Sequence, residues 1–226
     1  MNQTDDFEAQ REYMVREQIE RRGVSDPLVL EAMRAVPRHL FVPPDQRQWA
    51  YADCALRIDM EQTISQPYIV ALMTELMEIQ GGETVLEVGT GSGYQAAVLS
   101  QIAAQVYSIE RHPPLARVAQ ELLMQLGIGN VRVHTGDGTL GLPDHAPYQA
   151  IMVTAGAPKA PKSLLAQLID GGRLVIPVGG RFGQSLEVWQ RKGGKYRNKS
   201  ITSVAFVPLL GEEGWQEKDW NKFRPW

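Results

Sequence analysis

The sequence contains almost no cysteine and no cluster of histidines. Cys54 is the only cysteine among 226 residues, so the chain can form neither an internal disulfide nor a cysteine-based metal cluster. Its four histidines show no close ligand spacing, such as two residues one turn apart on a helix; they are His39, His112, His134 and His145. We therefore expect no bound metal and a reducing compartment such as the cytoplasm.

An excess of positive charge and a long apolar run are also missing. The chain has 23 Lys and Arg against 26 Asp and Glu, a formal net charge of -3, without the basic surplus typical of sequence-independent nucleic-acid binding. No apolar run approaches membrane-spanning length, and the start of the chain, which contains Asp5 and Asp6, is unlike a signal peptide. We expect a cytosolic protein that binds neither nucleic acid nor membranes.

What the sequence does contain is an orderly alternation of two periodicities. Helical patterns cover 7–22, 26–33 and the stretch from 67 to Gly81, and residues 49–66 between them are irregular and resemble a loop or lid. Strand-like runs follow at 85–88, 106–109, 131–133, 150–154 and 173–178, with helices near 94–103, 115–126 and 161–169. This order predicts an α/β domain whose mostly parallel sheet has helices on both faces. Gly193 and Gly194, between the runs 186–189 and 201–207, predict a C-terminal antiparallel hairpin.

A glycine-rich turn follows the first of these strands. Gly89, Gly91 and Gly93 alternate along the chain, which allows a sharp turn and a close approach to a ligand at the N-terminus of the next helix. A dinucleotide fingerprint would have a glycine where Tyr94 stands. The spacing, with Glu87 before the turn, instead resembles the first motif of Rossmann-like S-adenosylmethionine methyltransferases.

A second acid supports a cofactor site. Glu110 ends the next strand-like run about twenty residues later, the position where such folds bind ribose hydroxyls. The alternative is that Glu87 is a turn residue and Glu110 a solvated residue at a strand end.

Several further motifs occur together and in order along the chain. They are RGVSD at 22–26, VPRHLFVP at 36–43, QTISQPYIVA at 62–71, GDG at 136–138, VTA at 153–155, GGRLVIPVG at 171–179 and FVPL at 206–209. Together they resemble the protein-L-isoaspartate O-methyltransferase family over roughly residues 10–211.

The resemblance implies one Rossmann-like domain, 1–226, with a seven-stranded, mostly parallel sheet. Its parts would be N-terminal helices and a substrate loop (1–80), a cofactor-binding core (81–180), a C-terminal antiparallel hairpin (181–211) and an aromatic tail (212–226). The implied activity is transfer of a methyl group from S-adenosyl-L-methionine to the carboxylate of L-isoaspartyl residues in damaged peptides and proteins. This initiates their repair and leaves S-adenosyl-L-homocysteine.

The same resemblance assigns site residues. It makes Ser65 the active-site serine, with a substrate loop that includes Thr63, Ile64 and Gln66, and a substrate contact at Val207. The cofactor would be bound by Glu87, Gly89, Thr90, Gly91, Ser92, Gly93, Glu110, Arg111, Gly136, Asp137, Gly138 and Thr154. Two alternatives stay open: Ser65 and Gln66 precede Pro67, as expected of a helix N-terminus, and Asp137 begins a common Asp-Gly turn.

One segment departs from the family pattern. Asp59, Met60 and Glu61 stand where members usually carry glycines, which adds two carboxylates and stiffens the loop. The alternative functions are therefore a methyltransferase with another substrate, or a relative that binds S-adenosylmethionine without catalysis and acts as an interaction module. Residues 153–158, VTAGAP, lack the Asn/Asp-Pro-Pro-aromatic motif of base amino-methyltransferases. The aromatic tail could dock on its own domain or on a partner subunit.

Overall fold

Apolar side chains occupy both faces of the central strands. In β3 (Thr84–Val88), β4 (Gln105–Glu110) and β6 (Tyr148–Val153), most residues are buried. Val85 belongs to one core cluster, which also contains the N-terminal helices, while its neighbour Leu86 belongs to a second cluster at the other face. Strands buried on both faces are typical of a parallel sheet between two helical layers, which confirms the predicted fold class.

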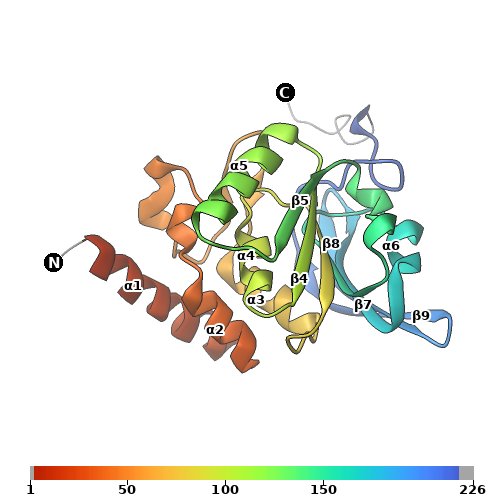
Figure 1. Cartoon of the computed structure of the whole chain (residues 1–226), viewed down its shortest axis with the longest axis horizontal. Coiled ribbons are helices and arrows are strands. Elements are labelled where there is room, and N and C mark those ends of the chain that lie inside the picture. The colour runs from red at the N-terminus through yellow and green to blue at the C-terminus, as the bar shows by residue number, and fades with distance from the viewer. Residues whose placement is uncertain (1–2, 219–226) are drawn as a thin grey trace.

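The structure is a computed structural model and describes residues 3–218 (Figure 1). Its main sheet has the order β5-β4-β3-β6-β7-β8-β9, where β5 is Val131–Thr135, β7 is Leu168–Gly180, β8 is Gly183–Lys192 and β9 is Lys195–Val204. The strands from β5 to β7 are parallel, and β8 and β9 are antiparallel to their neighbours. The chain leaves β3 towards β4 and later returns to β6 on the other side, so the carboxyl end of β3 is a topological switch point.

Helices cover this sheet, and the N-terminal helices lie at one end of the molecule. α1 (Gln3–Tyr13) continues through a π-helical segment, η1 (Met14–Ile19), and a 3-10 turn, η2 (Glu20–Arg22). The next helix is α2 (Pro27–Ala35), and the side chain of its N-cap residue, Asp26, accepts a hydrogen bond from Leu28 N. The remaining helices are α3 (Pro67–Leu76), α4 (Tyr94–Ser100), α5 (Pro113–Gln125) and α6 (Lys162–Ala166). Figure 1 shows α1 and α2 at the end of the molecule opposite the β8–β9 hairpin.

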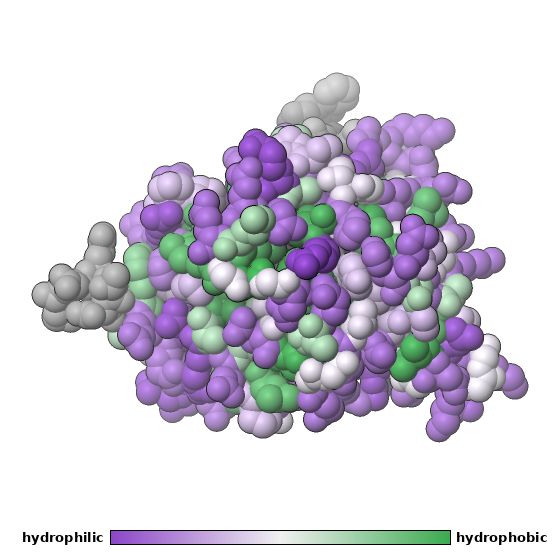
Figure 2. Space-filling view, in the orientation of Figure 1, coloured by the Kyte–Doolittle hydropathy of each residue, from purple (hydrophilic) through white to green (hydrophobic). Residues whose placement is uncertain are grey.

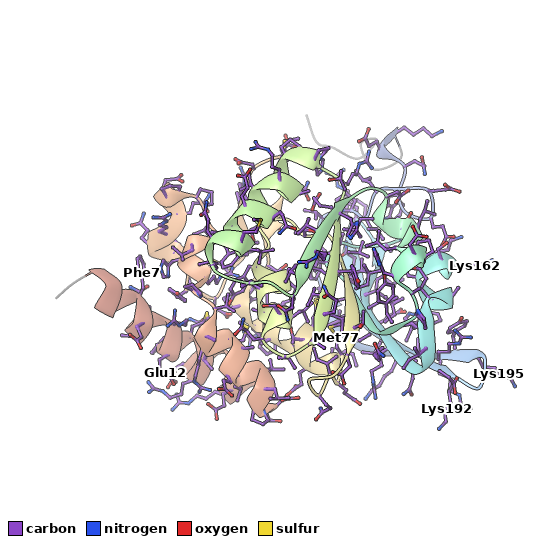
Figure 3. All side chains as sticks on the ribbon, in the orientation of Figure 1. Phe7, Glu12, Met77, Lys162, Lys192 and Lys195 are labelled. Atoms are coloured by element: carbon purple, nitrogen blue, oxygen red, sulfur yellow. The ribbon has the colours of Figure 1, made fainter. Side chains whose placement is uncertain are left out.

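The hydropathy of the surface is consistent with the burial of apolar side chains in the core. Figure 2 shows a mostly hydrophilic face, in which apolar residues form separate patches. Lys192 and Lys195 lie together at the tip of the β8–β9 hairpin in Figure 3, at the opposite end from Phe7 and Glu12 on α1. The basic residues of this hairpin are therefore remote from the N-terminal helices.

Several predicted boundaries are wrong. α3 ends at Leu76 rather than near Gly81, because Met77 N and Glu78 N bond three residues back and Glu78 has a φ of 51°. The last helix is short since β7 already starts at Leu168. The second hairpin strand is Lys195–Val204, earlier than the expected 201–207.

Residues 49–66 are also less irregular than expected. They contain the end of a 3-10 helix, η4 (Pro44–Trp49), and a small antiparallel hairpin of β1 (Leu56–Arg57) and β2 (Thr63–Ile64). Two-residue strands are too short to produce a periodic pattern in the sequence.

Candidate functional site

The glycine turn lies at the carboxyl end of β3. Gly89, Gly91 and Gly93 all have positive φ, at 100°, 53° and 86°. A Cβ on Gly89 would lie 2.4 Å from Thr154 Oγ1, and that hydroxyl donates a hydrogen bond to the Gly89 carbonyl at 2.7 Å. A side chain is therefore excluded at this position by both conformation and space. Thr154, which directly follows β6, thus stabilises the turn through this hydrogen bond.

Glu110 joins the turn to the neighbouring strand. Its carboxylate accepts from Gly91 N and from His112 N, each at 2.9 Å, and its side chain lines the cavity beside the turn. Each carboxylate oxygen can accept a second hydrogen bond, so Glu110 keeps acceptor capacity towards this cavity.

Glu87 is the other acid predicted to bind the cofactor, and it lies in β3 directly before the turn. It is fully buried below the turn and is not among the residues that line the cavities described here. Ser108 donates to its Oε2 at 2.5 Å, and Ser108 Oγ lies 2.5 Å from Thr90 Oγ1. Burial, the largest effect, raises the pKa of Glu87 to about 8, and the nearby Glu110 also raises it. Burial thus favours the neutral form of Glu87, which supports the turn from behind, and its Oε1 has no hydrogen-bond partner within residues 3–218.

Two connected cavities follow the turn. A cavity of about 100 Å³ is lined by Gly89, Glu110, Gly138 and Thr154 among others, and a smaller one of about 40 Å³ by Thr90, Ser92 and Tyr94. Gly138 packs closely, because a Cβ there would lie 2.4 Å from Val88 Cγ1. Four of the predicted cofactor residues line neither cavity: Glu87, Gly93, Gly136 and Asp137. An added Cβ on Gly93 would lie 3.2 Å from Ala119 Cβ in α5.

Asp137 makes the turn that the alternative interpretation expects. Its Oδ1 accepts from Thr139 N and Thr139 Oγ1, and its Oδ2 accepts from Glu212 N at 2.7 Å. With Gly136 and Arg111 it also lines a cavity of about 390 Å³ next to the glycine turn. Oδ2 retains the capacity for one further hydrogen bond, so the turn role and a ligand role are compatible.

The four predicted residues of the substrate loop have different surroundings. Gln66 is the N-cap residue of α3 but makes no side-chain capping bond; its Nε2 donates to Asp53 Oδ1 at 2.7 Å. Ser65 is half-buried, and its hydroxyl forms no hydrogen bond with the described residues 3–218. Ile64 is 4% exposed and belongs to the core. The capping interpretation of Ser65 is therefore not realised, and its hydroxyl faces cavities.

A larger cavity lies on the other side of this loop. It measures about 560 Å³ and is lined by the loop and by the 181–184 and 203–206 segments. Thr63 lines this cavity and both cavities at the glycine turn, and Ser65 lines this cavity and the smaller of those two. Val207 contributes to the turn-side cavity instead. Thr63 and Ser65 therefore lie where the two halves of the site meet.

The β1–β2 hairpin covers the glycine turn. A Cβ on Gly91 would lie 3.6 Å from Ile58 Cδ1, which places this hairpin directly against the turn. Its own tight turn has Met60 and Glu61 at φ values of 58° and 56°, and Gln62 N donates to the Asp59 carbonyl. Two consecutive non-glycine residues with positive φ are unusual, and they fall in the segment that departs from the family pattern.

The sequence interpretation assigned no role to several residues that shape the site. Arg38 is fully buried and bonds to the Ser65 carbonyl, and Gln184 bonds to both backbone polar groups of Phe206. Arg38 lies in one of the quoted motifs, but a long-range contact has no local pattern. Among residues 3–218 there is no group of three or more potential ligands that could hold a metal ion, and none of their helices is long and apolar enough to cross a membrane.

Comparisons with known proteins agree with this geometry. The family model described as protein-L-isoaspartate(D-aspartate) O-methyltransferase matches residues 9–214. A protein-L-isoaspartate O-methyltransferase 2 of Pelobacter propionicus is 58% identical over 210 residues, covering 92% of this chain and 93% of its own. A protein-L-isoaspartate O-methyltransferase of Methanoregula boonei is 53% identical over 207 residues, covering 92% and 95%.

A solved protein-L-isoaspartate O-methyltransferase has the same fold. It superposes with a TM-score of 0.81 at 31% identity and covers 90% of this chain and 67% of the solved chain. The likeness therefore extends through most of the chain.

Proposed function

The chain belongs to the protein-L-isoaspartate(D-aspartate) O-methyltransferase family, and from this we propose how its own residues carry out the reaction. The protein is an S-adenosylmethionine-dependent methyltransferase. It transfers a methyl group to the side-chain carboxylate of L-isoaspartyl residues in damaged proteins and peptides, and so initiates their repair.

The observation that carries the assignment of roles is the position of Thr63 and Ser65. Both line the large cavity and also the smaller cavity at the glycine turn. A methyl transfer needs the acceptor and the donor in line, and each can enter from one side of this junction. The junction is thus the point of transfer.

The glycine-turn side fits the methyl donor. Gly89 and Gly138 line the cavity without side chains, so a ligand can approach their backbone, and Glu110 has acceptor capacity for ribose hydroxyls. When bound, S-adenosylmethionine supplies an electrophilic methyl group on a positively charged sulfur. Arg111, Gly136 and Asp137 lie on the adjoining cavity and are assigned to the adenine end.

The acceptor side needs orientation more than proton transfer. A side-chain carboxyl with a reference pKa near ~3.9 is already ionised at neutral pH, so no general base is required. The Ser65 hydroxyl is available to donate a hydrogen bond to this carboxylate and hold one of its oxygens towards the donor. The β1–β2 hairpin, which lies against Gly91, reduces access of water to the junction.

An extended segment beside the large cavity suits a peptide. Gln184 uses its side-chain amide to bond Phe206 N at 2.8 Å and Phe206 O at 3.1 Å, which holds residues 205–207 extended beyond the end of β9. The backbone groups of Ala205 point to the opposite side from those of Phe206, because alternate residues of an extended chain do so. The Val207 carbonyl already accepts from Gly156 N at 2.8 Å, so the backbone of Ala205 is the part of this segment that can pair with a substrate backbone whatever its side chains, as a repair enzyme with many substrates requires.

We also propose that the protein works in the cytoplasm and not on nucleic acid. The exposed, unpaired thiol of Cys54 suits a reducing compartment, and the net charge of -3 does not favour binding to phosphate backbones. Altered substrate preference remains the second proposal, because Asp59 and Glu61 add negative charge beside the junction.

Two variants test the division of roles. Ser65→Ala is expected to lower kcat for an isoaspartyl peptide by on the order of 10-fold while the Kd for S-adenosylhomocysteine stays within about threefold. Gly91→Val places a β-branched residue at a φ of 53° against Ile58, and should abolish donor binding in calorimetry while the melting transition stays cooperative. If both variants lose donor affinity equally, Ser65 does not have the orienting role.

A further inference from the structure

Arg38 is the largest side chain that is fully buried in the described part of the chain. It lies in η3 (Arg38–Leu40), and its exposed fraction is 0%. None of the ion pairs found among residues 3–218 includes it. Burial lowers the pKa of its guanidinium. A buried cation without a carboxylate partner is costly, so its contacts need a strong reason to be retained.

Those contacts join the two ends of the loop that carries the substrate-facing hydroxyls. Arg38 Nε donates to the Ala50 carbonyl at 2.7 Å, and Nη2 donates to the Ser65 carbonyl at 2.7 Å. Residues 50–65 between these points include the whole β1–β2 hairpin. Since the guanidinium is planar and rigid, it fixes the separation of the two carbonyls.

The same guanidinium also contacts the donor side. Its Cζ lies 4.8 Å from the ring centroid of Tyr94, in a cation–π arrangement. Tyr94 is buried and is the first residue of α4, directly after Gly93 of the glycine turn. One rigid group therefore touches both the base of the acceptor loop and the start of the donor-binding helix.

We propose that Arg38 is a positioning residue that sets the Ser65 loop relative to the glycine turn, and so aligns the acceptor carboxylate with the donor methyl. This inference rests on the proposed junction of the two cavities at Thr63 and Ser65. Arg38 lines neither cavity that meets there and acts through the backbone of Ser65. Misalignment of about 1 Å can reduce a rate by on the order of 100-fold. Loss of the two hydrogen bonds from the Arg38 guanidinium therefore lowers kcat first.

The test compares Arg38→Lys and Arg38→Met with Arg34→Lys, which changes a partly exposed arginine of α2 that pairs with Glu12 of α1. Lysine keeps the charge but cannot bond two carbonyls in a fixed fork. We expect Arg38→Lys to lower kcat for an isoaspartyl peptide about 10- to 100-fold, with the Kd for S-adenosylhomocysteine within about threefold of wild type. Arg38→Met should lose more activity, and Arg34→Lys should match wild type.

Hydrogen exchange supplies a readout that is independent of activity. In Arg38→Lys the amides of residues 50–66 should exchange at least tenfold faster, whereas those of β3 and β4 should not change. A folded Arg38→Lys protein with wild-type kcat and unchanged exchange in 50–66 overturns the proposal, as does a parallel fall of donor affinity, melting temperature and kcat. A wild-type protein that does not methylate the peptide refutes the proposed function instead, and the exchange result still decides the role of Arg38.

Discussion

The Ser108 hydroxyl lies 2.5 Å from Glu87 Oε2 and donates a hydrogen bond to it. Thr90 Oγ1 lies 2.5 Å from Ser108 Oγ, so a short polar chain runs from β3 through β4 to the glycine turn inside the core. Desolvation raises the pKa of Glu87 to about 8, well above the ordinary 4.5. Burial therefore favours the protonated form of the acid that precedes the glycines, and the second acid, Glu110, lines the cavity.

This proton links Glu87 to the pH dependence of stability. Between pH 4.5 and about 8 the folded state holds the proton and the unfolded state has released it, so the free energy of unfolding falls as pH rises and levels off above about 8. Glu87→Gln resembles the protonated acid and removes this contribution. Its melting temperature should fall less than that of wild type between pH 5 and pH 8.5. Glu121→Gln, a surface control on α5, should keep the wild-type slope, and an equal slope in Glu87→Gln would show that Glu87 is ionised throughout.

The turn at Met60 and Glu61 should be strained by its side chains. A positive φ costs a non-glycine residue about 1–2 kcal/mol, and Asn-Gly is the preferred pair for such a turn. The double variant Met60→Asn with Glu61→Gly should raise the free energy of unfolding by about 1–2 kcal/mol in urea titrations. Glu61→Gln keeps a side chain at this φ and removes only the charge, so it should give no such gain. A lower free energy of unfolding in the double variant would contradict the backbone strain inferred at Met60 and Glu61.

Phe182 should contribute to peptide binding rather than to transfer. Its side chain is 93% exposed, and the residue lines the large cavity at the β7–β8 turn. Covering part of an aromatic side chain stabilises a complex by about 1 kcal/mol, so Phe182→Ala should raise KM for an isoaspartyl peptide about fivefold and leave kcat unchanged. Tyr196→Ala removes another exposed aromatic, on β9 outside this cavity, and should leave both constants as in wild type. Equal effects of the two variants would argue against this role.

Local patterns predicted where the glycine turn and Glu110 lie in the fold. A strand, a glycine turn and a helix are adjacent in sequence, so Gly89, Gly91 and Gly93 could be placed without tertiary information, as could Glu110 at a strand end. Whether Glu87 faces a ligand or the core could not be predicted in this way, because that choice depends on its burial beside Ser108.

The substrate half depends on contacts between distant segments. The β1–β2 hairpin has strands of two residues, and its place over Gly91 cannot be inferred from periodicity. Arg38 meets Ser65 across 27 positions, and Gln184 meets Phe206 across 22. The aromatic tail was expected to dock; Leu210 and Trp215 do form a β-bridge, and residues 219–226 lie outside the described part of the chain.

The most direct measurement offers S-adenosylmethionine labelled at the methyl group to two peptides that differ only in an isoaspartyl or a normal aspartyl linkage. The account predicts base-labile label on the isoaspartyl peptide alone, because only that geometry brings the carboxylate to Ser65 while the peptide backbone pairs with Ala205. Label on neither peptide, or equal label on both, would contradict it.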